Sequence, residues 1–169
     1  YPSDAFIALV LEVQPHQVTL VPDPPDVLTS NAGWDTVRHA DFLKKVIHVF
    51  HSKGIRTSIF VEANPLMIRH AVACGTNRVE LYTESYARNY TSHRETAIQD
   101  FILAANAAHE VGLEVNAGHD LNLENLAYFY QHIPFLKEVS IGHALISDAL
   151  YYGLQNTIQM YLNQLKLPS

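Results

Sequence analysis

The sequence predicts an α/β fold in which a parallel β-sheet is flanked by helices. Short β-branched and apolar runs alternate with helix-like segments along the chain, and this order is typical of strand–helix–strand units. The strand-like runs read as apolar nearly throughout, as expected of strands covered on both faces. Polar residues follow strand after strand, among them Asp23, Glu62, His119 and His143. A barrel, in which every strand end reaches one mouth, explains this better than an open sheet, whose site gathers at one switch point.

The first predicted elements are a helix, a strand and a second helix. A helix over residues 2–13 has a proline suited to its first turn, and Pro15 stops it. Residues 17–21 form a compact β-branched strand, and a long loop rich in proline follows. The second helix covers residues 36–53, with apolar side chains along one face, and Gly54 closes it.

The same unit then recurs along the rest of the chain. Asn64 and Pro65 form a helix start, Gly75 is the matching stop, and Asn122 caps a short helix. The further expected strands cover residues 56–62, 78–82, 113–116 and 138–141. The further expected helices cover residues 65–74, 92–111, 123–131 and 147–165, with a loop at 83–91. The last helix is expected to turn Leu150, Leu154, Ile158 and Tyr161 or Leu162 inward.

Composition limits the class of protein. The 169 residues fit one domain, residues 1–169, and 48% hydrophobic with 17% charged residues indicates a globular chain. A net charge of −6 provides no general attraction to nucleic acid or to an acidic membrane. No apolar run reaches the roughly 20 residues that span a bilayer. The single cysteine, Cys74, leaves no internal disulfide and fits a reducing compartment, the cytoplasm.

Two stretches end in Gly-His, namely VNAGHDLN at residues 115–122 and VSIGHA at residues 139–144. They lie one strand–helix repeat apart, so in a barrel of parallel strands both point at the same mouth. Glycine there lets backbone N–H groups approach an anion, and histidine can move protons.

The motifs of the chain resemble those of the pyridoxine 5′-phosphate synthase family, (β/α)₈ TIM-barrel enzymes of vitamin B6 biosynthesis. The matching stretches, in the family's order, are VTLVPD, LTS…GWD, SIFVE, RVELYT, GLEVNAGHDLN, SIGHALISDAL and YYGL. The resemblance covers nearly the whole chain. It implies that this sequence supplies about strands 4–8 with the surrounding helices, and that strands 1–3 are not included.

The resemblance also implies a reaction. The family condenses 1-deoxy-D-xylulose 5-phosphate with 3-amino-2-oxopropyl phosphate, and it releases inorganic phosphate and water without a metal or an organic cofactor. It forms closed homo-oligomers, which implies an octamer here. Ring closure of this kind needs repeated proton transfer in a shielded pocket.

Site residues follow from the match of motifs. His119 corresponds to the family's proton donor, and Glu80 to its transition-state-stabilising glutamate. The substrate contacts that the resemblance implies are Thr29, Asp120, Gly142 and His143. Simpler roles are open for four positions: a structural or merely exposed side chain for His119, an ion-pair partner for Glu80, a turn or cap bond for Thr29, and a tight turn for Gly142.

This chain also departs from the family pattern. The family's other bases lie on strands 1–3 and have no counterpart here, so residues 1–169 alone are expected to be inactive. Glu84 and Asp148 differ from the residues that some members carry. Two other functions are open: a non-catalytic partial barrel that keeps a phosphate pocket, and a metal-dependent barrel hydrolase, prompted by ten histidines.

Overall fold

Five parallel strands form one sheet in sequential order in the computed structural model, which describes residues 1–24, 26–27 and 29–166. The strands are β1 (Gln17–Leu20), β2 (Arg56–Val61), β3 (Arg78–Tyr82), β4 (Glu114–Gly118) and β5 (Leu136–Ser140). Each strand pairs in parallel with the next one along the chain. The strand order never reverses, as it would in a doubly wound open sheet, so the expected barrel is confirmed as a partial one. Strands β1 and β5 are its edges.

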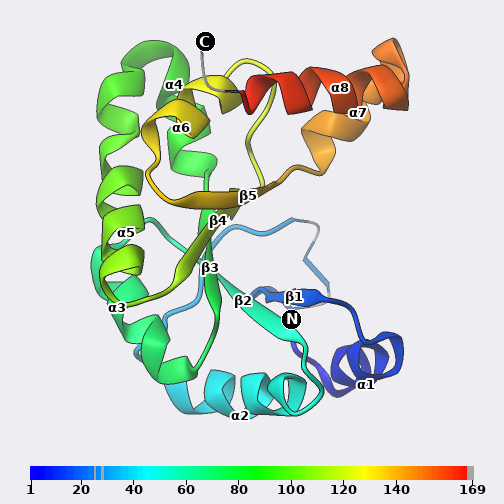
Figure 1. Cartoon of the computed structure of the whole chain (residues 1–169), viewed down its shortest axis with the longest axis vertical. Coiled ribbons are helices and arrows are strands. Elements are labelled where there is room, and N and C mark those ends of the chain that lie inside the picture. Colours follow the sequence, from blue (N-terminus) through cyan, green and yellow to red (C-terminus); the bar gives the residue numbers. More distant parts are fainter. Residues whose placement is uncertain (25, 28, 167–169) are drawn as a thin grey trace.

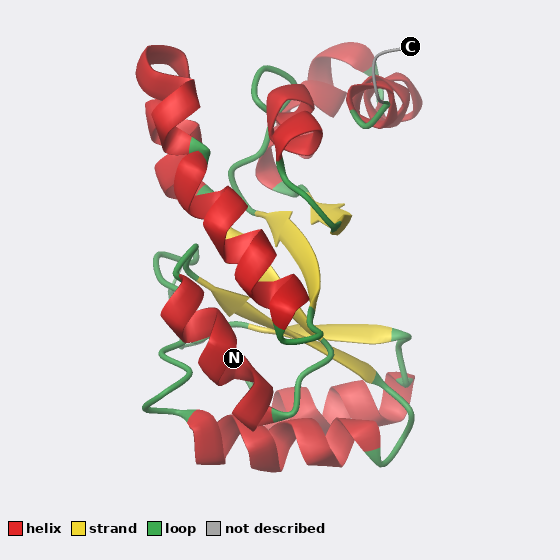
Figure 2. Ribbon diagram, turned by 60° about the vertical axis from the view of Figure 1, so that its left-hand side comes forward, coloured by secondary structure: helices red, strands yellow, loops and turns green. Residues whose placement is uncertain are grey.

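Eight helices accompany the sheet in the described part of the chain. They are α1 (Asp4–Val13), α2 (Ala40–His51), α3 (Pro65–Cys74), α4 (Glu84–Ala97), α5 (Gln99–Glu110), α6 (Leu126–His132), α7 (His143–Tyr152) and α8 (Leu154–Gln164). Helices α2, α3 and α5 lie along the outside of the curved sheet, while α7 and α8 project beyond β5 at the upper right of Figure 1. Figure 2 shows the same curvature from the side, with the strands fanned between the helices. Among the described helices, none is both long and apolar enough to cross a membrane.

The strands alternate in chemistry, which corrects the expectation that they are apolar on both faces. Outward side chains such as Leu20, Ile59, Leu81 and Val115 are fully buried in the core beneath the helices. The side chains at the intervening positions are polar or aromatic. Several of the polar ones are buried with partners across the inside of the sheet, as Glu80 is with Thr19 and Asn116 with Glu138.

A polar network fills the inside of the sheet at the amino ends of the strands. Arg78 is 6% exposed, and its guanidinium binds the carboxylates of Glu114 and Glu138 on the two following strands. Arg56 adds a second cation, with Nη2 at 3.7 Å from Glu138 Oε1. A buried cation needs such partners, so this network holds the strands in register. Its members are Gln17, Arg56, Arg78, Glu114, Asn116 and Glu138.

The loop expected over residues 83–91 is wrong, because α4 begins at Glu84. Its sequence is mostly polar, and its two large side chains with apolar rings are Tyr86 and Tyr90. Tertiary contact anchors it instead: the Tyr86 ring is fully buried against Phe101 and Phe129, and its hydroxyl donates to the Asn125 carbonyl oxygen at 2.8 Å. A non-helical backbone at His93 (φ −147°) then kinks the helix.

The prediction of a single last helix over residues 147–165 is also wrong. Gly153, with φ 78° and ψ 143°, separates α7 from α8, and α7 already begins at His143. Only Tyr161 of the side chains expected to turn inward is buried. Leu150 is 82% exposed, and the others are also exposed.

Candidate active site

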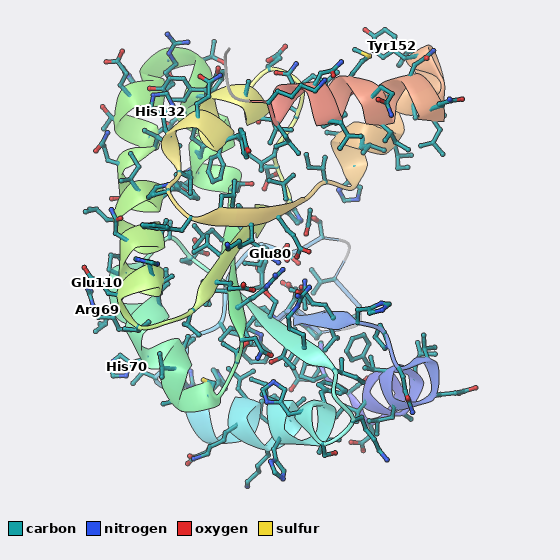
Figure 3. The ribbon with its side chains drawn as sticks, in the orientation of Figure 1. Arg69, His70, Glu80, Glu110, His132 and Tyr152 are labelled. Atoms are coloured by element: carbon teal, nitrogen blue, oxygen red, sulfur yellow. The ribbon has the colours of Figure 1, made fainter. Side chains whose placement is uncertain are left out.

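A cleft of about 480 Å³ opens at the carboxyl ends of the strands. Because the strands are parallel, the residues at their carboxyl ends come together there. Figure 3 shows Glu80 near the centre of the sheet, inside its curve, whereas Arg69, His70 and Glu110 lie outside. The cleft is lined by Val21, Ser30, Phe60, Glu80, His119, Ser140, Ile141 and Gly142.

The His119 imidazole is held from both sides at the end of β4. Its Nδ1 lies 2.8 Å from Asp120 Oδ2, and its Nε2 lies 2.9 Å from Thr29 Oγ1. An ionised carboxylate only accepts hydrogen bonds, so Nδ1 carries a proton. In the neutral ring Nε2 is then the acceptor, and in the charged ring it is a donor. The Thr29 hydroxyl therefore lies at the ring nitrogen of His119 that can either accept or donate a hydrogen bond.

Aromatic packing sets the angle of this ring. The Tyr82 ring meets it edge-on at 5.3 Å between centroids, and Phe60 packs against Tyr82 at 5.1 Å. The Tyr82 hydroxyl donates to the Ser30 carbonyl oxygen at 3.1 Å. That bond fixes the loop after β1 over the mouth and brings the neighbouring Thr29 to His119. Burial, followed by the nearby Asp120 carboxylate, raises the pKa of Tyr82, which keeps it a donor.

Glu80 lies deeper in the same cleft, with 7% of its surface exposed. Its Oε2 accepts a hydrogen bond from the Thr19 hydroxyl at 3.1 Å. Burial raises the pKa of the Glu80 carboxyl above its usual range. Hydrogen bonds from Thr19 and Ser140 and the nearby His119 oppose that rise, while Glu138 adds to it. Among the described residues Glu80 forms no ion pair, so the ion-pair alternative lacks a partner.

The second Gly-His motif starts a helix at the rim of the cleft. Gly142 occupies the N-cap of α7, and His143 is its first residue. The first N–H groups of a helix have no partner within it, so they are available to an anion. The rings of His119 and His143 are 6.2 Å apart and perpendicular. The prediction that the two motifs share one mouth is therefore confirmed.

Comparisons with known proteins agree with the motifs. Residues 1–167 match the family described as "Pyridoxal phosphate biosynthesis protein PdxJ". A Bacteroides thetaiotaomicron protein named pyridoxine 5′-phosphate synthase is 58% identical over 166 residues, which cover 98% of this chain and 70% of the relative. The chain belongs to the PdxJ family. Relatives of the same name from Cytophaga hutchinsonii and Porphyromonas gingivalis are 57% and 54% identical, with 98% of this chain and 69% and 70% of the relatives covered.

PdxJ proteins are TIM-barrel enzymes of vitamin B6 biosynthesis, and the partial barrel seen here fits that architecture. All six residues singled out from the PdxJ motifs lie at one mouth. Thr29 bonds to His119, which leaves the simpler turn-bond role without support in the described contacts. Leu28, part of the LTS motif, lies outside the described residues. The six residues are Thr29, Glu80, His119, Asp120, Gly142 and His143.

Glu84 and Asp148, the two residues that differ from those of some PdxJ members, each contact a side chain nearby. Glu84 Oε1 lies 3.1 Å from Arg88 Nη1, one turn further along α4. Asp148 Oδ2 accepts a hydrogen bond from the Tyr161 hydroxyl at 2.7 Å and joins α7 to α8.

Three residues that contact the site residues were given no role from the sequence, although Thr83 was counted among the polar residues at strand ends. Thr19 and Ser140 bond to Glu80, and Thr83 bonds to the turn that carries His119. Thr19 and Ser140 occupy inward positions of their strands, alternating with apolar residues. Period-two alternation within β1 and β5 was the available signal.

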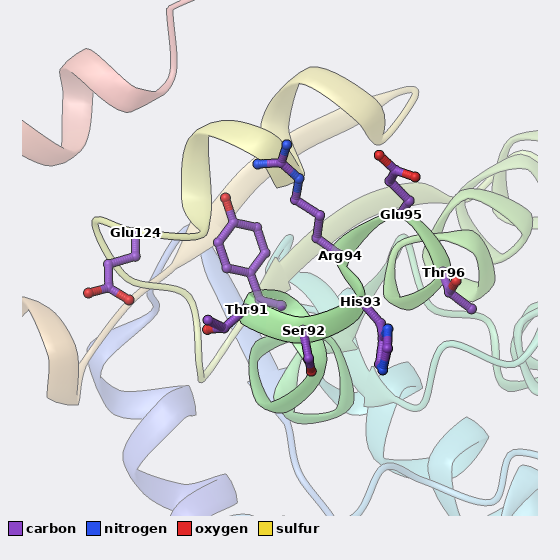
Figure 4. Close-up of a pocket in the computed structure, with 8 residues that line it drawn as sticks. Thr91, Ser92, His93, Arg94, Glu95, Thr96 and Glu124 are labelled. Carbon is purple, nitrogen blue, oxygen red and sulfur yellow. The ribbon is translucent and has the colours of Figure 1, made fainter.

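A second hollow, of about 540 Å³, lies at the kink of α4 on the outside of the fold (Figure 4). Its lining comes from residues 90–96 and Glu124, and none of the six site residues contributes. Within the described ranges, no three His, Cys, Asp or Glu side chains are grouped so that they could hold a metal ion. The hydrolase alternative therefore has no metal site to support it there.

Gly118 is required where β4 meets β5. A Cβ at this position would lie 2.3 Å from the Ser140 carbonyl oxygen and 3.1 Å from Glu80 Oε1. We expect Gly118→Ala to force the strands apart and to lower the free energy of unfolding by about 1–3 kcal/mol. Denaturant unfolding measures this. Gly142→Ala is the matched control, because a Cβ there meets no described atom within 4 Å. Equal stability of the two variants would contradict the close approach.

Proposed function

We propose that this chain contributes the catalytic mouth of a pyridoxine 5′-phosphate synthase. The enzyme condenses 1-deoxy-D-xylulose 5-phosphate with 3-amino-2-oxopropyl phosphate to give pyridoxine 5′-phosphate, inorganic phosphate and water. Membership of the PdxJ family and the name of its relatives support this reaction. The observation that carries the proposal is the His119 imidazole, held between Asp120 and Thr29 in the cleft that contains Glu80.

In this proposal His119 is the proton donor. Asp120 fixes the proton on Nδ1, so Nε2 faces the substrate with a proton when the ring is charged. A substrate oxygen that replaces the Thr29 hydroxyl at 2.9 Å would be within range for proton transfer. Loss of water from the carbinol formed on ring closure needs such an acid.

Glu80 stabilises positive charge in this proposal. Condensation of an amine with a ketone passes through a protonated imine, and an ionised carboxylate nearby lowers the energy of that species. The carboxylate acts strongly because it is buried away from water. Thr19 and Ser140 hold it in place. Neither step assigned to these residues requires a metal or an organic cofactor.

A direct assay tests the proposal. The natural protein, incubated with both phosphorylated substrates, is expected to release inorganic phosphate and to form pyridoxine 5′-phosphate in equal amounts. Phosphate is measured colorimetrically, and the product by its absorbance and mass. Phosphate release without the pyridine product would contradict the condensation.

Gly142 and His143 bind a substrate or product phosphate in this proposal. We expect Gly142→Val to weaken phosphate-ester affinity by roughly tenfold, because the side chain occupies the space in front of the first N–H groups of α7. Titration calorimetry with pyridoxine 5′-phosphate measures the loss, and Gly142→Ala is expected to give a smaller one. Unchanged affinity for the valine variant would place the phosphate elsewhere.

A closed homo-oligomer, an octamer by family resemblance, and a cytoplasmic location belong to the same proposal. Large apolar side chains stand exposed on α7 and α8, and such surfaces in isolation are a typical sign of an interface. Figure 3 shows Tyr152 at the far end of α7. The exposed residues are Ile146, Leu150, Tyr151, Tyr152, Leu154, Ile158 and Leu162.

A polypeptide limited to residues 1–169 is expected to be inactive, because the family's remaining bases lie on strands 1–3. It is also expected to associate or aggregate through the edges of β1 and β5, whose backbone groups seek partners. Light scattering after gel filtration measures this, with the natural protein at equal concentration as the control. A soluble monomer would contradict association through these edges.

A further inference from the structure

His119 has a backbone conformation that its side chain disfavours. Its φ is 92°, and Gln14 and Phe135 are the other non-glycine residues with positive φ in the described part of the chain. A non-glycine residue in such a region costs free energy and persists only where its surroundings fix it. The direction of the imidazole depends on this strained backbone, so the groups that fix it control the proposed acid.

One side-chain hydroxyl bonds to the backbone on both sides of the strained residue. The Thr83 Oγ1 donates to the Gly118 carbonyl oxygen at 2.6 Å and accepts from the Asp120 N–H at 3.1 Å. The Thr83 N–H also donates to the Gly118 carbonyl oxygen, at 3.2 Å. Thr83 therefore holds the backbone on both sides of His119. From the other side, the His119 N–H donates to the Ser140 carbonyl oxygen at 3.1 Å.

The Thr83 side chain bonds to this turn and not to its own helix. It occupies the N-cap of α4, where a threonine side chain usually accepts a hydrogen bond from its own helix. Here it forms no such cap bond. Its side chain is fully buried and does not line the cleft. It therefore acts on the mouth only through the backbone of residues 118–120.

We propose that Thr83 is a positioning residue that enforces the strained backbone of His119 and so aims its Nε2 into the cleft. The inference rests on the proposed function for its effect on turnover. Its effect on the backbone is independent of that function.

The kinetic test compares three variants of the natural protein. Thr83→Val keeps the shape of the side chain and removes the hydroxyl, and we expect kcat to fall by roughly 10-fold to 100-fold with KM changed less than about threefold, because the acid is misplaced. Thr83→Ser keeps the hydroxyl and is expected to restore kcat to within about threefold of wild type.

Thr76→Val is the matched control. Thr76 is a buried threonine at the opposite end of β3, and its hydroxyl bonds to the carbonyl oxygens of Thr57 and Arg78 at 3.0 Å each. We expect a similar fall in melting temperature but an unchanged kcat. If Thr83→Val loses stability as Thr76→Val does and keeps wild-type kcat, the positioning role is refuted.

A folding experiment separates this inference from the proposed function. In the wild-type background, His119→Gly is expected to have a folding equilibrium constant roughly fivefold or more above that of His119→Ala, since only glycine accepts positive φ freely. With Thr83→Val added, that advantage is expected to disappear, because the turn can relax. An equal glycine advantage in both backgrounds would overturn the inference. If the wild-type protein forms no pyridoxine 5′-phosphate, the proposed function fails while this comparison still decides the role of Thr83.

Discussion

Replacing His119 with asparagine is expected to lower turnover by roughly 10²-fold to 10⁴-fold, the range for loss of a general acid. Asparagine tolerates positive φ better than most residues, so the backbone at φ 92° is kept. Its side chain can still bond to Asp120 or Thr29 but cannot release a proton. Because the phosphate contacts are assigned to Gly142 and His143, phosphate-ester affinity is expected to stay within about threefold of wild type.

Steady-state kinetics and calorimetry on the natural protein check both parts. His70→Asn is the matched control, since His70 lies exposed on α3, outside the curve of the sheet in Figure 3. It is expected to behave as wild type. Turnover of His119→Asn close to that of wild type would refute the acid role, and a parallel loss of phosphate affinity would show that the ring binds rather than protonates.

Replacing Glu80 with glutamine is expected to lower turnover by roughly 10²-fold and at the same time to raise stability at neutral pH. The amide is isosteric and can accept the Thr19 hydrogen bond, but it carries no charge to stabilise an imine cation. It also removes the cost of ionising a carboxyl that is 7% exposed. We therefore expect the free energy of unfolding at pH 7 to be higher for the variant than for wild type.

The pH dependence of that gain has a definite sign. The pKa of Glu80 is raised in the folded protein, so below the ordinary carboxyl range of about 4.3 both states are protonated and wild type and variant should match. As pH rises through the folded pKa, wild type loses stability relative to Glu80→Gln, and the difference then becomes constant. Thermal unfolding from pH 4 to pH 8 measures it.

Glu110→Gln is the control for this series. Glu110 is an exposed partner of Arg69 on the outer surface, so its replacement is expected to change stability little at any pH. A stability gap between Glu80→Gln and wild type that does not grow with pH would contradict the buried, raised-pKa carboxyl. Wild-type turnover in Glu80→Gln would remove Glu80 from the mechanism.

Much of the partial barrel could be predicted from local signals. The cap at Asn64 is confirmed, with its side chain accepting from the Leu66 N–H at 2.9 Å, and Gly75 ends α3 with φ 81°. Strand β3 was predicted with its observed bounds, since RVELY is short and β-prone between two stop signals. The first part of α4, residues 84–91, was not, because this mostly polar segment is anchored by the burial of Tyr86, which no local signal announces.

The sequence and the tertiary structure also determined different parts of the site. Because parallel strands bring their ends to one mouth, the sequence alone determined that Glu80 and the two Gly-His motifs meet. The PdxJ motifs assigned the individual roles. Only the tertiary structure decided what holds these groups: Thr19 at the Glu80 carboxyl, and Thr83 on both sides of His119. The Thr19–Glu80 contact joins residues that are 61 positions apart in the sequence, and the two Thr83 contacts join residues more than 30 positions apart. All of them cross between strands whose register depends on packing. Alternation along β1 places Thr19 on the inner face, but no local pattern identifies its partner. A threonine at a helix N-cap is likewise taken for a cap until its neighbour in space is known.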